Sequence, residues 1–203
     1  RFYAQHQNEL GTPFRRYQIA PVWRAENTQR GRLREFYQCD VDIVGSESQL
    51  SDAEVVACIC FVLNELGVKA YEVRINDRGI FNVIADALGL SMEQSIILLR
   101  AIDKYYKIGT HGVLAELTAQ NFPKQHEQFI RDFLESGTNQ RALEQVQKLL
   151  PNHPQVTEHI TGLLDLLKKL GVESSKLVFD PLIARGLDYY TGMVFEVMLT
   201  GET

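Results

Sequence analysis

The sequence predicts an α+β protein in which helices flank a mainly antiparallel sheet and a small all-helical domain is inserted into it. Three observations lead to this prediction. Apolar and polar residues alternate near both ends of the chain, apolar residues recur at helical spacing in its middle, and glycine or proline separates the segments. We therefore expect residues 1–80 and 172–203 to form the α+β core and residues 81–171 to form the helical insertion.

Two strands joined by a basic loop are predicted in the first quarter of the chain. The first strand, near residues 17–26, has Arg24 and Glu26 on one face and an apolar set on the other: Tyr17, Ile19 and Trp23. In the second strand, polar or aromatic even positions alternate with odd positions of apolar character: Phe36, Gln38, Asp40 and Asp42 against Tyr37, Cys39, Val41 and Ile43. Cations opposite carboxylates on one sheet surface suggest a binding floor for a ligand that is both anionic and cationic.

The charge of the loop differs from that of the whole chain. A net charge of -5 argues against a general nucleic-acid binder. Between Arg15 and Arg34, however, six arginines accompany one acid, Glu26, and such a focused positive site suits a bound polyphosphate. Charge alone favours the alternative, a solvated hairpin loop.

Helical patterns begin after the hairpin. A capping box at Ser51–Glu54 predicts a helix whose apolar stripe precedes Gly67: Val55, Ile59, Val62, Leu63 and Leu66. A strand follows at residues 71–75, and a second capping box, Ser91–Gln94, opens another stripe: Met92, Ile96, Leu99, Ile102 and Tyr106. Shorter helices precede a last stripe that Gly171 closes: Ile160, Leu163, Leu164, Leu167 and Leu170. We interpret these stripes as packing core, not as cofactor contacts.

Strand patterns return at residues 177–179 and 193–199, and the loop between them is distinctive. It reads Ala184-Arg-Gly-Leu-Asp-Tyr-Tyr-Thr-Gly192, so two glycines bracket an aspartate and two tyrosines. Glycine permits close backbone approach, and tyrosine and arginine provide directional hydrogen bonds. Spacing alone supports a ligand loop and an ordinary exposed loop about equally.

Several classes of site are not indicated. The three cysteines form no CxxC, and two of them, Cys58 and Cys60, point to different faces of a predicted helix, so we interpret them as buried free thiols in a reducing cytoplasm. No HExxH pattern occurs, and we predict no protein metal site. No apolar run approaches the roughly 20 residues that span a bilayer. Because the chain starts at Arg1 within a structured pattern, we expect it to be a piece of a longer protein.

The two polar segments together resemble a known family. Arg24-Ala-Glu26, the basic loop and Arg32-x-x-x-Phe36 resemble motif 2 of the class II aminoacyl-tRNA synthetases. The stretches Glu35–Gly45 and Arg185–Gly192 are similar to histidyl-tRNA synthetases in particular. The resemblance implies a class II synthetase-like catalytic fold that lacks motifs 1 and 3. It also implies that the isolated chain has little or no aminoacylation activity.

The resemblance assigns ATP to the hairpin. Arg24 would contact the α-phosphate and stabilise the transition state, and Arg32 would contact the phosphate tail. Glu26 would accept a hydrogen bond from the adenine amino group, and Phe36 would stack on the adenine ring. Mg²⁺ would be held mainly by the phosphates of ATP.

The resemblance assigns histidine to both polar segments. Gln38 and Asp42 would hold the amino acid, with Asp42 meeting its ammonium group. Tyr189 and Tyr190 would line the imidazole pocket. Arg185 would approach the carboxylate and the α-phosphate as a second catalytic arginine.

The implied activity is ATP-dependent formation of histidyl-adenylate and transfer of histidine to tRNA(His) by a cytoplasmic homodimer without a membrane partner. The helical insertion would contact the acceptor arm of the tRNA. Two alternatives remain open: a histidine-binding regulatory paralogue of an ATP phosphoribosyltransferase, and a synthetase-like sensor of uncharged tRNA. Neither needs the ATP residues, so the presence of Arg24, Glu26, Arg32 and Phe36 favours the ligase.

Overall fold

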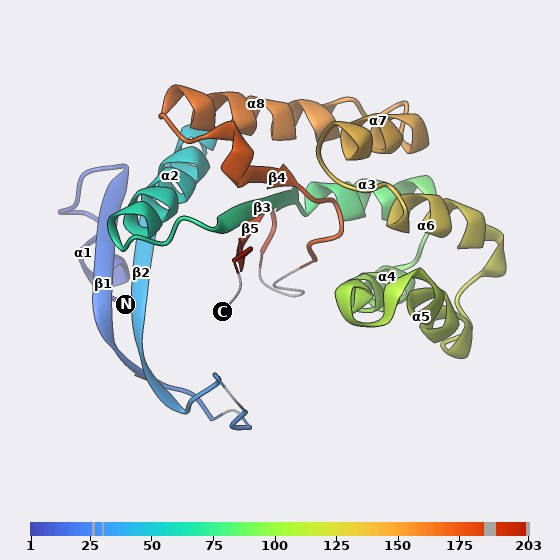
Figure 1. Ribbon diagram of the computed structural model, residues 1–203, viewed down its shortest axis with the longest axis horizontal. Helices are drawn as coiled ribbons and strands as arrows, with labels where there is room; N and C mark the ends of the chain where they lie inside the picture. The colour runs from blue at the N-terminus through green and yellow to red at the C-terminus, as the bar shows by residue number, and fades with distance from the viewer. Residues whose placement is uncertain (26, 30, 185–189, 202–203) are drawn as a thin grey trace.

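The computed structural model describes residues 1–25, 27–29, 31–184 and 190–201 (Figure 1). Its strands are β1 (Phe14–Trp23), β2 (Glu35–Val44), β3 (Tyr71–Asp77), β4 (Leu177–Phe179) and β5 (Met193–Leu199). Its α-helices are α1 (Phe2–His6), α2 (Gln49–Glu65), α3 (Gly79–Ala87), α4 (Met92–Ile102), α5 (Tyr105–Ala119), α6 (Glu127–Leu134), α7 (Asn139–Leu149) and α8 (Gln155–Lys169). Two 3₁₀ turns, η1 (Lys124–His126) and η2 (Ser174–Lys176), complete the elements.

The strands form two sheets in the described part of the chain. β1 and β2 make an antiparallel hairpin, with Phe14 opposite Val44 and Trp23 opposite Glu35. The other sheet has the order β4-β3-β5, in which β3 pairs antiparallel with β5 and parallel with β4. The predicted α+β class with mainly antiparallel pairing is confirmed. The difference is that the hairpin lies apart from the three-stranded sheet (Figure 1).

One hydrophobic core lies where α2 and α8 pack against the three-stranded sheet. Its buried members come from both helices and from β3 and β4: Ala53, Val56, Cys60, Tyr71, Val73, Ile75, Leu163, Leu167 and Leu177. The predicted stripe of α8 is largely confirmed, because Ile160, Leu163 and Leu167 are fully buried. The helix ends at Lys169, and the predicted Gly171 follows its C-cap Leu170 with a φ of +83°.

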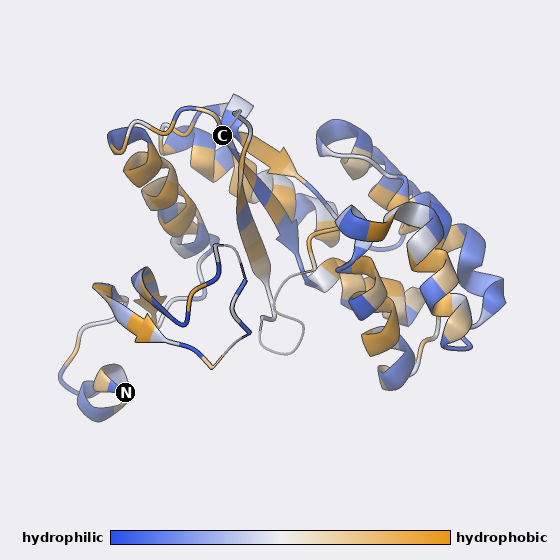
Figure 2. Ribbon diagram, turned by 60° about the horizontal axis from the view of Figure 1, so that its bottom comes forward, coloured by the Kyte–Doolittle hydropathy of each residue, from blue (hydrophilic) through white to orange (hydrophobic). Residues whose placement is uncertain are grey.

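The prediction for α2 was wrong in two respects. The helix begins at Gln49, and its N-cap is Ser48, whose hydroxyl accepts a hydrogen bond from the backbone nitrogen of Leu50. The face that packs on the core carries Ala53, Val56 and Cys60, whereas Val62 and Leu66 of the predicted stripe are exposed. Apolar residues occur nearly all around this helix, as its coloration in Figure 2 shows, so periodicity could not identify the buried side.

A second core joins α3–α8 to the end of β4. The capping box at Ser91 is confirmed: its hydroxyl accepts from the backbone of Gln94 at 3.2 Å, and the Gln94 side chain accepts from the backbone of Ser91 at 2.9 Å. The predicted stripe divides because α4 ends at Ile102 and α5 begins at Tyr105. Phe179, Leu182 and Ala184 belong to this second core. The helices therefore pack directly on the chain that leaves β4, and the proposed boundaries of an inserted domain remain a prediction.

The three cysteines differ in their exposure to solvent. Only Cys60 is buried; Cys58 is half-buried and Cys39 is exposed, so the prediction of buried thiols holds for one residue. Burial raises the pKa of the Cys60 thiol.

Among the helices described, none is long and apolar enough to cross a membrane.

Candidate functional site

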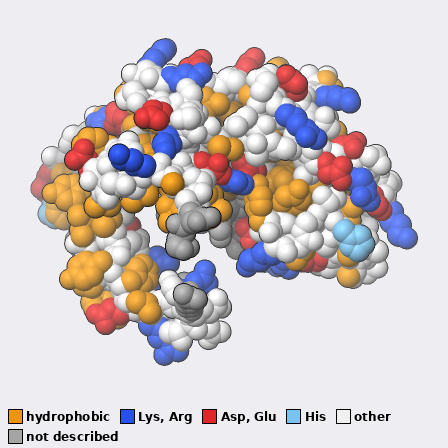
Figure 3. Space-filling model, viewed as in Figure 1, with side chains coloured by type: hydrophobic (Ala, Val, Ile, Leu, Met, Phe, Trp, Pro, Cys, Tyr) orange, Lys and Arg blue, Asp and Glu red, His pale blue; other side chains and the backbone are white. Residues whose placement is uncertain are grey.

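The hairpin has a polar face and an apolar face, and the polar face is the more covered of the two. Because β1 and β2 pair with even positions opposite even positions, Arg16 faces Asp42 and Gln18 faces Asp40. Phe36, Gln38, Asp40 and Asp42 of β2 are half-buried. The apolar face is instead open, with exposed fractions from 41% to 76% for Val41, Ile19, Trp23, Tyr37 and Tyr17. Figure 3 shows apolar side chains along the left edge of the molecule, where Figure 1 draws the hairpin.

Arg24 lies at the end of the polar row. β1 spans Phe14–Trp23 and ends one residue earlier, so the strand predicted near residues 17–26 lies three residues closer to the N-terminus. The backbone nitrogen of Arg24 still donates to the carbonyl of Arg34 at 2.8 Å, which continues the pairing beyond the strand. Its guanidinium donates to Gln38 Oε1 at 2.8 Å and lies over the ring of Phe36, 5.0 Å from the centroid. The cation is thereby held between an amide and an aromatic ring.

A cleft of about 240 Å³ opens beside this arginine. It is lined by Arg24, Gly31, Arg32, Leu33 and Phe36. A tight turn shapes one wall: the backbones of Gln29 and Arg32 exchange hydrogen bonds of 2.9 and 3.2 Å, and Gly31 adopts a φ of +77° that favours glycine. Two guanidinium groups and one aromatic face suit an anion attached to a flat ring. Three of the four predicted ATP residues thus share one cleft, and Glu26 lies outside the described residues.

The predicted histidine residues of the hairpin lie in a continuous polar row. The amide of Gln38 accepts from Arg24 and donates to Asp40 Oδ1. Further along, Arg16 donates to Asp42 Oδ2 at 2.6 Å and to Gln18 Oε1 at 2.7 Å. Cations and carboxylates therefore alternate along one surface.

The alternation and the family resemblance assign no role to three members of this row: Arg16, Gln18 and Asp40. Arg16 is one of the six arginines of the basic segment. The signal that could have found it is the strand register, since Arg16 lies directly opposite Asp42.

A charged contact fixes the base of the hairpin to α2. Arg15 donates to both carboxylate oxygens of Glu54, at 2.7 and 2.9 Å. These hydrogen bonds lower the pKa of Glu54 and raise the pKa of Arg15. The contact therefore ties β1 of the hairpin to α2.

The second predicted segment is described only in part. Arg185 and Tyr189 lie outside the described residues, and Tyr190, which precedes β5, has half of its surface exposed. A larger groove of about 420 Å³ occurs between α3 and α4, but its lining is mostly apolar, with Arg78 and Asp86 as its charged members. We therefore place the candidate site at the hairpin, whose lining carries the charged and stacking groups.

The fold and the arginine-rich hairpin agree with the resemblance to the class II aminoacyl-tRNA synthetases. A sequence model described as Histidyl-tRNA synthetase matches residues 1–203, so the chain belongs to the histidyl-tRNA synthetase family. It is 42% identical over 205 residues to the histidine–tRNA ligase of Treponema denticola, covering 98% of this chain and 45% of that protein. The corresponding ligase of Phocaeicola vulgatus is 40% identical over 201 residues, covering 97% of this chain and 44% of that protein.

Solved structures agree with this assignment. The histidyl-tRNA synthetase of Nostoc sp. PCC 7120 superposes with a TM-score of 0.85 at 32% identity, over 98% of this chain and 47% of that one. A Bacillus halodurans protein titled ATP phosphoribosyltransferase regulatory subunit/histidyl-tRNA synthetase superposes at 0.83 with 22% identity, which shows a shared fold alone. It covers 98% of this chain and 51% of that one. The chain spans about half the length of the curated relatives it matches.

Proposed function

We propose that the full-length protein is a histidine–tRNA ligase. It joins L-histidine to ATP, releases pyrophosphate, and transfers histidine from the adenylate to the 3′ end of tRNA(His). The observation that carries the proposal is the cleft of Arg24, Arg32 and Phe36, which is continuous with the polar row of Gln38 and Asp42. One part fits a nucleotide and the other fits an amino acid.

The first step needs fixed positive charge. The carboxylate of histidine attacks the α-phosphorus in line, and the bond to pyrophosphate breaks. Both reacting groups are anionic, so their repulsion must be offset by cations that are already in place. Arg24 meets this requirement because Gln38 and Phe36 hold its guanidinium in place. A permanently charged, planar group suits this role better than lysine.

Each remaining residue receives a role in the same proposal. Arg32 binds the phosphate tail, Phe36 stacks on adenine and Glu26 accepts from the adenine amino group. Gln38 and Asp42 hold histidine, with the Asp42 carboxylate facing the ammonium. We assign Tyr189 and Tyr190 to the imidazole and Arg185 to the carboxylate and α-phosphate, on the strength of the Arg185–Gly192 motif.

Magnesium fits this arrangement as a companion of ATP. The cleft lining consists of cations, a glycine and apolar groups, so it offers the phosphates partners and offers a metal ion none. Mg²⁺, when bound, neutralises phosphate charge and would be held by phosphate oxygens. The cations of this chain supply the rest of the charge. We further propose that the full-length protein acts in the cytoplasm as a homodimer.

The test is histidine-dependent exchange of pyrophosphate into ATP by the full-length protein. We expect exchange that requires histidine and is not supported by other amino acids. Histidine binding without exchange would instead favour a regulatory paralogue of an ATP phosphoribosyltransferase. Binding of tRNA without exchange would favour a sensor of uncharged tRNA.

A further inference from the structure

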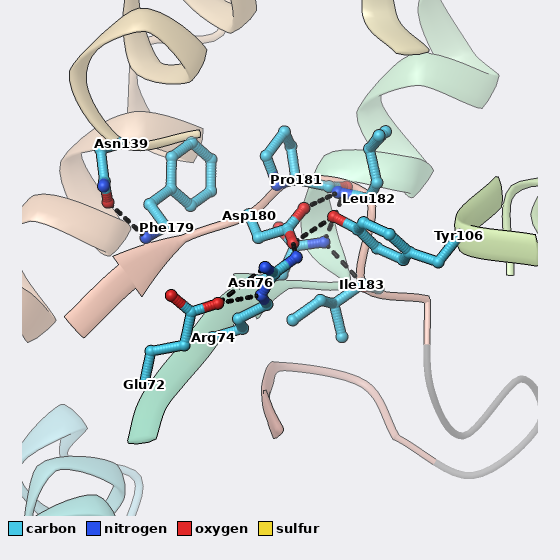
Figure 4. A network of polar contacts seen from close by, with 10 residues as sticks. All are labelled: Glu72, Arg74, Asn76, Tyr106, Asn139, Phe179, Asp180, Pro181, Leu182 and Ile183. Atoms are coloured by element: carbon cyan, nitrogen blue, oxygen red, sulfur yellow. Dashed lines mark hydrogen bonds and ion pairs between the residues drawn. The ribbon is translucent and has the colours of Figure 1, made fainter. Parts of the chain in front are cut away.

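The chain segment that leads to Arg185 is anchored from within the protein. Residues 180–184 follow β4 and are all buried, and the Asp180 carboxylate is fully inaccessible to solvent. Figure 4 shows that side chains from β3 and α5 converge on this segment. The hairpin site described above uses none of these groups.

Asp180 joins three parts of the structure. Its Oδ2 accepts a hydrogen bond from Arg74 Nη1 at 2.9 Å and another from the hydroxyl of Tyr106. Its Oδ1 accepts from the backbone nitrogen of Leu182 at 3.1 Å, and its own backbone nitrogen donates to the carbonyl of Ile75 at 3.0 Å. A buried carboxylate is tolerated only when it is paired and hydrogen-bonded, and Asp180 is both. The Asp180 side chain therefore holds the segment that follows β4 against Arg74 of β3 and Tyr106 of α5.

Arg74 is itself held in place. Its Nε donates to Glu72 Oε1 at 2.7 Å, and its guanidinium lies 5.2 Å from the ring centroid of Tyr106. Burial works against the guanidinium charge, but the hydrogen bond to Glu72 and the surrounding anionic groups outweigh it, so the pKa of Arg74 is raised. Arg74 remains charged, and Asp180 keeps its counter-ion.

Asn76 holds the backbone of the residues that follow Asp180. It is fully buried, and its Nδ2 donates to the carbonyls of Pro181 at 3.0 Å and Ile183 at 2.9 Å. Its Oδ1 has no hydrogen-bond partner among the described residues. A buried acceptor without a partner costs about 1–3 kcal/mol, so stability alone does not explain an amide at this position. The two donors, which hold the carbonyls on either side of Leu182, do explain it.

We infer that Asn76 and Asp180 are positioning residues that set the path of residues 181–184, the segment that precedes Arg185 in the sequence, and that Tyr106 ties this path to helix α5. The inference rests on the proposed function, in which Arg185 contacts the reacting groups. Catalysis by a positioned charge is sensitive to displacement, and a shift of about 1 Å can lower a rate by about 100-fold. In this inference Asn76, Asp180 and Tyr106 act on catalysis only through the segment that precedes Arg185.

Two variants of the full-length protein test the inference. Asn76→Asp has the same shape but replaces the double donor with oxygen atoms that face two carbonyls. Tyr106→Phe removes one hydroxyl and keeps the ring over Arg74. Tyr71→Phe is the matched control, because it removes a tyrosine hydroxyl that bonds to Cys60 O at 3.3 Å and Asn64 Oδ1 at 3.2 Å, away from residues 180–184.

Two measurements are made on each variant: kcat and KM for pyrophosphate exchange, and hydrogen exchange of the backbone amides of residues 182–184. We expect kcat to fall by about 100-fold for Asn76→Asp and by about tenfold for Tyr106→Phe, with smaller changes in KM for ATP. Amide exchange should accelerate in both variants and stay unchanged in Tyr71→Phe. If Asn76→Asp does not fold, Tyr106→Phe decides alone.

The outcomes separate the inference from the proposed function. Unchanged kcat and unchanged amide exchange in Tyr106→Phe would overturn the inference. Accelerated amide exchange with kcat equal to that of the control would overturn it too, because the anchoring would then be structural only. A wild-type protein that does not exchange pyrophosphate would refute the proposed function. In that case, unchanged amide exchange would also refute the anchoring, and accelerated exchange would support it.

Discussion

Arg24 offers the sharpest test of the candidate site. Its guanidinium bonds to Gln38 at 2.8 Å and lies 5.0 Å from the centroid of Phe36. These two contacts orient the charge, so little reorganisation is needed in the transition state. Removing one such preorganised group costs about 3–4 kcal/mol, which corresponds to a 10²–10³-fold fall in kcat. Arg24→Ala should show this loss in the full-length protein. Arg24→Lys should lose less because it keeps the charge without the planar fork.

Single-turnover formation of adenylate, measured at saturating ATP and histidine, isolates the chemical step. Arg131→Ala is the control, since Arg131 makes an exposed pair with Glu127 at 3.1 Å in α6 and should change neither rate nor KM. If Arg24→Ala raised only the KM for ATP, the residue would bind the ground state and transition state equally. Our assignment of Arg24 as a catalytic residue would then be wrong.

Three further predictions concern the rest of the chain. Burial, with the neighbouring Cys60, raises the pKa of Tyr71 to about 12, whereas an unfolded tyrosine ionises near pH 10. The contribution of neutral Tyr71 to the free energy of unfolding is therefore present below pH 10 and lost as the pH rises toward 12. The difference in urea midpoint between wild type and Tyr71→Phe should shrink over this range. A constant difference would contradict the reasoning. Leu163→Ala should lower the free energy of unfolding by about 2–5 kcal/mol, because Leu163 is fully buried in the core that α2 and α8 form with the sheet. Urea titration measures the loss, and a loss below about 1 kcal/mol would mean that the core closes around the cavity. The isolated 203 residues should charge no tRNA(His) in an aminoacylation assay, and robust turnover would refute the view that this chain is part of a larger catalytic unit.

Local patterns in the sequence predicted most elements. The strands at residues 177–179 and 193–199 and the capping box at Ser91 have the predicted bounds, because alternation and capping depend on neighbours a few residues apart. The start of α2 was misplaced by three residues because Ser48 and Ser51 are both plausible N-caps. Its buried face was misjudged because the helix is apolar on several sides.

The polar face of the hairpin was determined by the sequence itself, since the alternation from Phe36 to Asp42 leaves no other choice of face. Only the tertiary structure decided which groups meet on it. Arg16 pairs with Asp42, and Gln38 lies between Arg24 and Asp40, because the register of two strands brings them together.

The same is true of the anchor before Arg185. Arg74 and Asp180 are 106 positions apart, and Tyr106 reaches them from a helix, so no local pattern could relate the three. The direction in which successive side chains point depends on a few consecutive residues, so the sequence alone can predict it. Contact between distant polar groups depends on strand register and on how helices pack, and only the folded protein defines these.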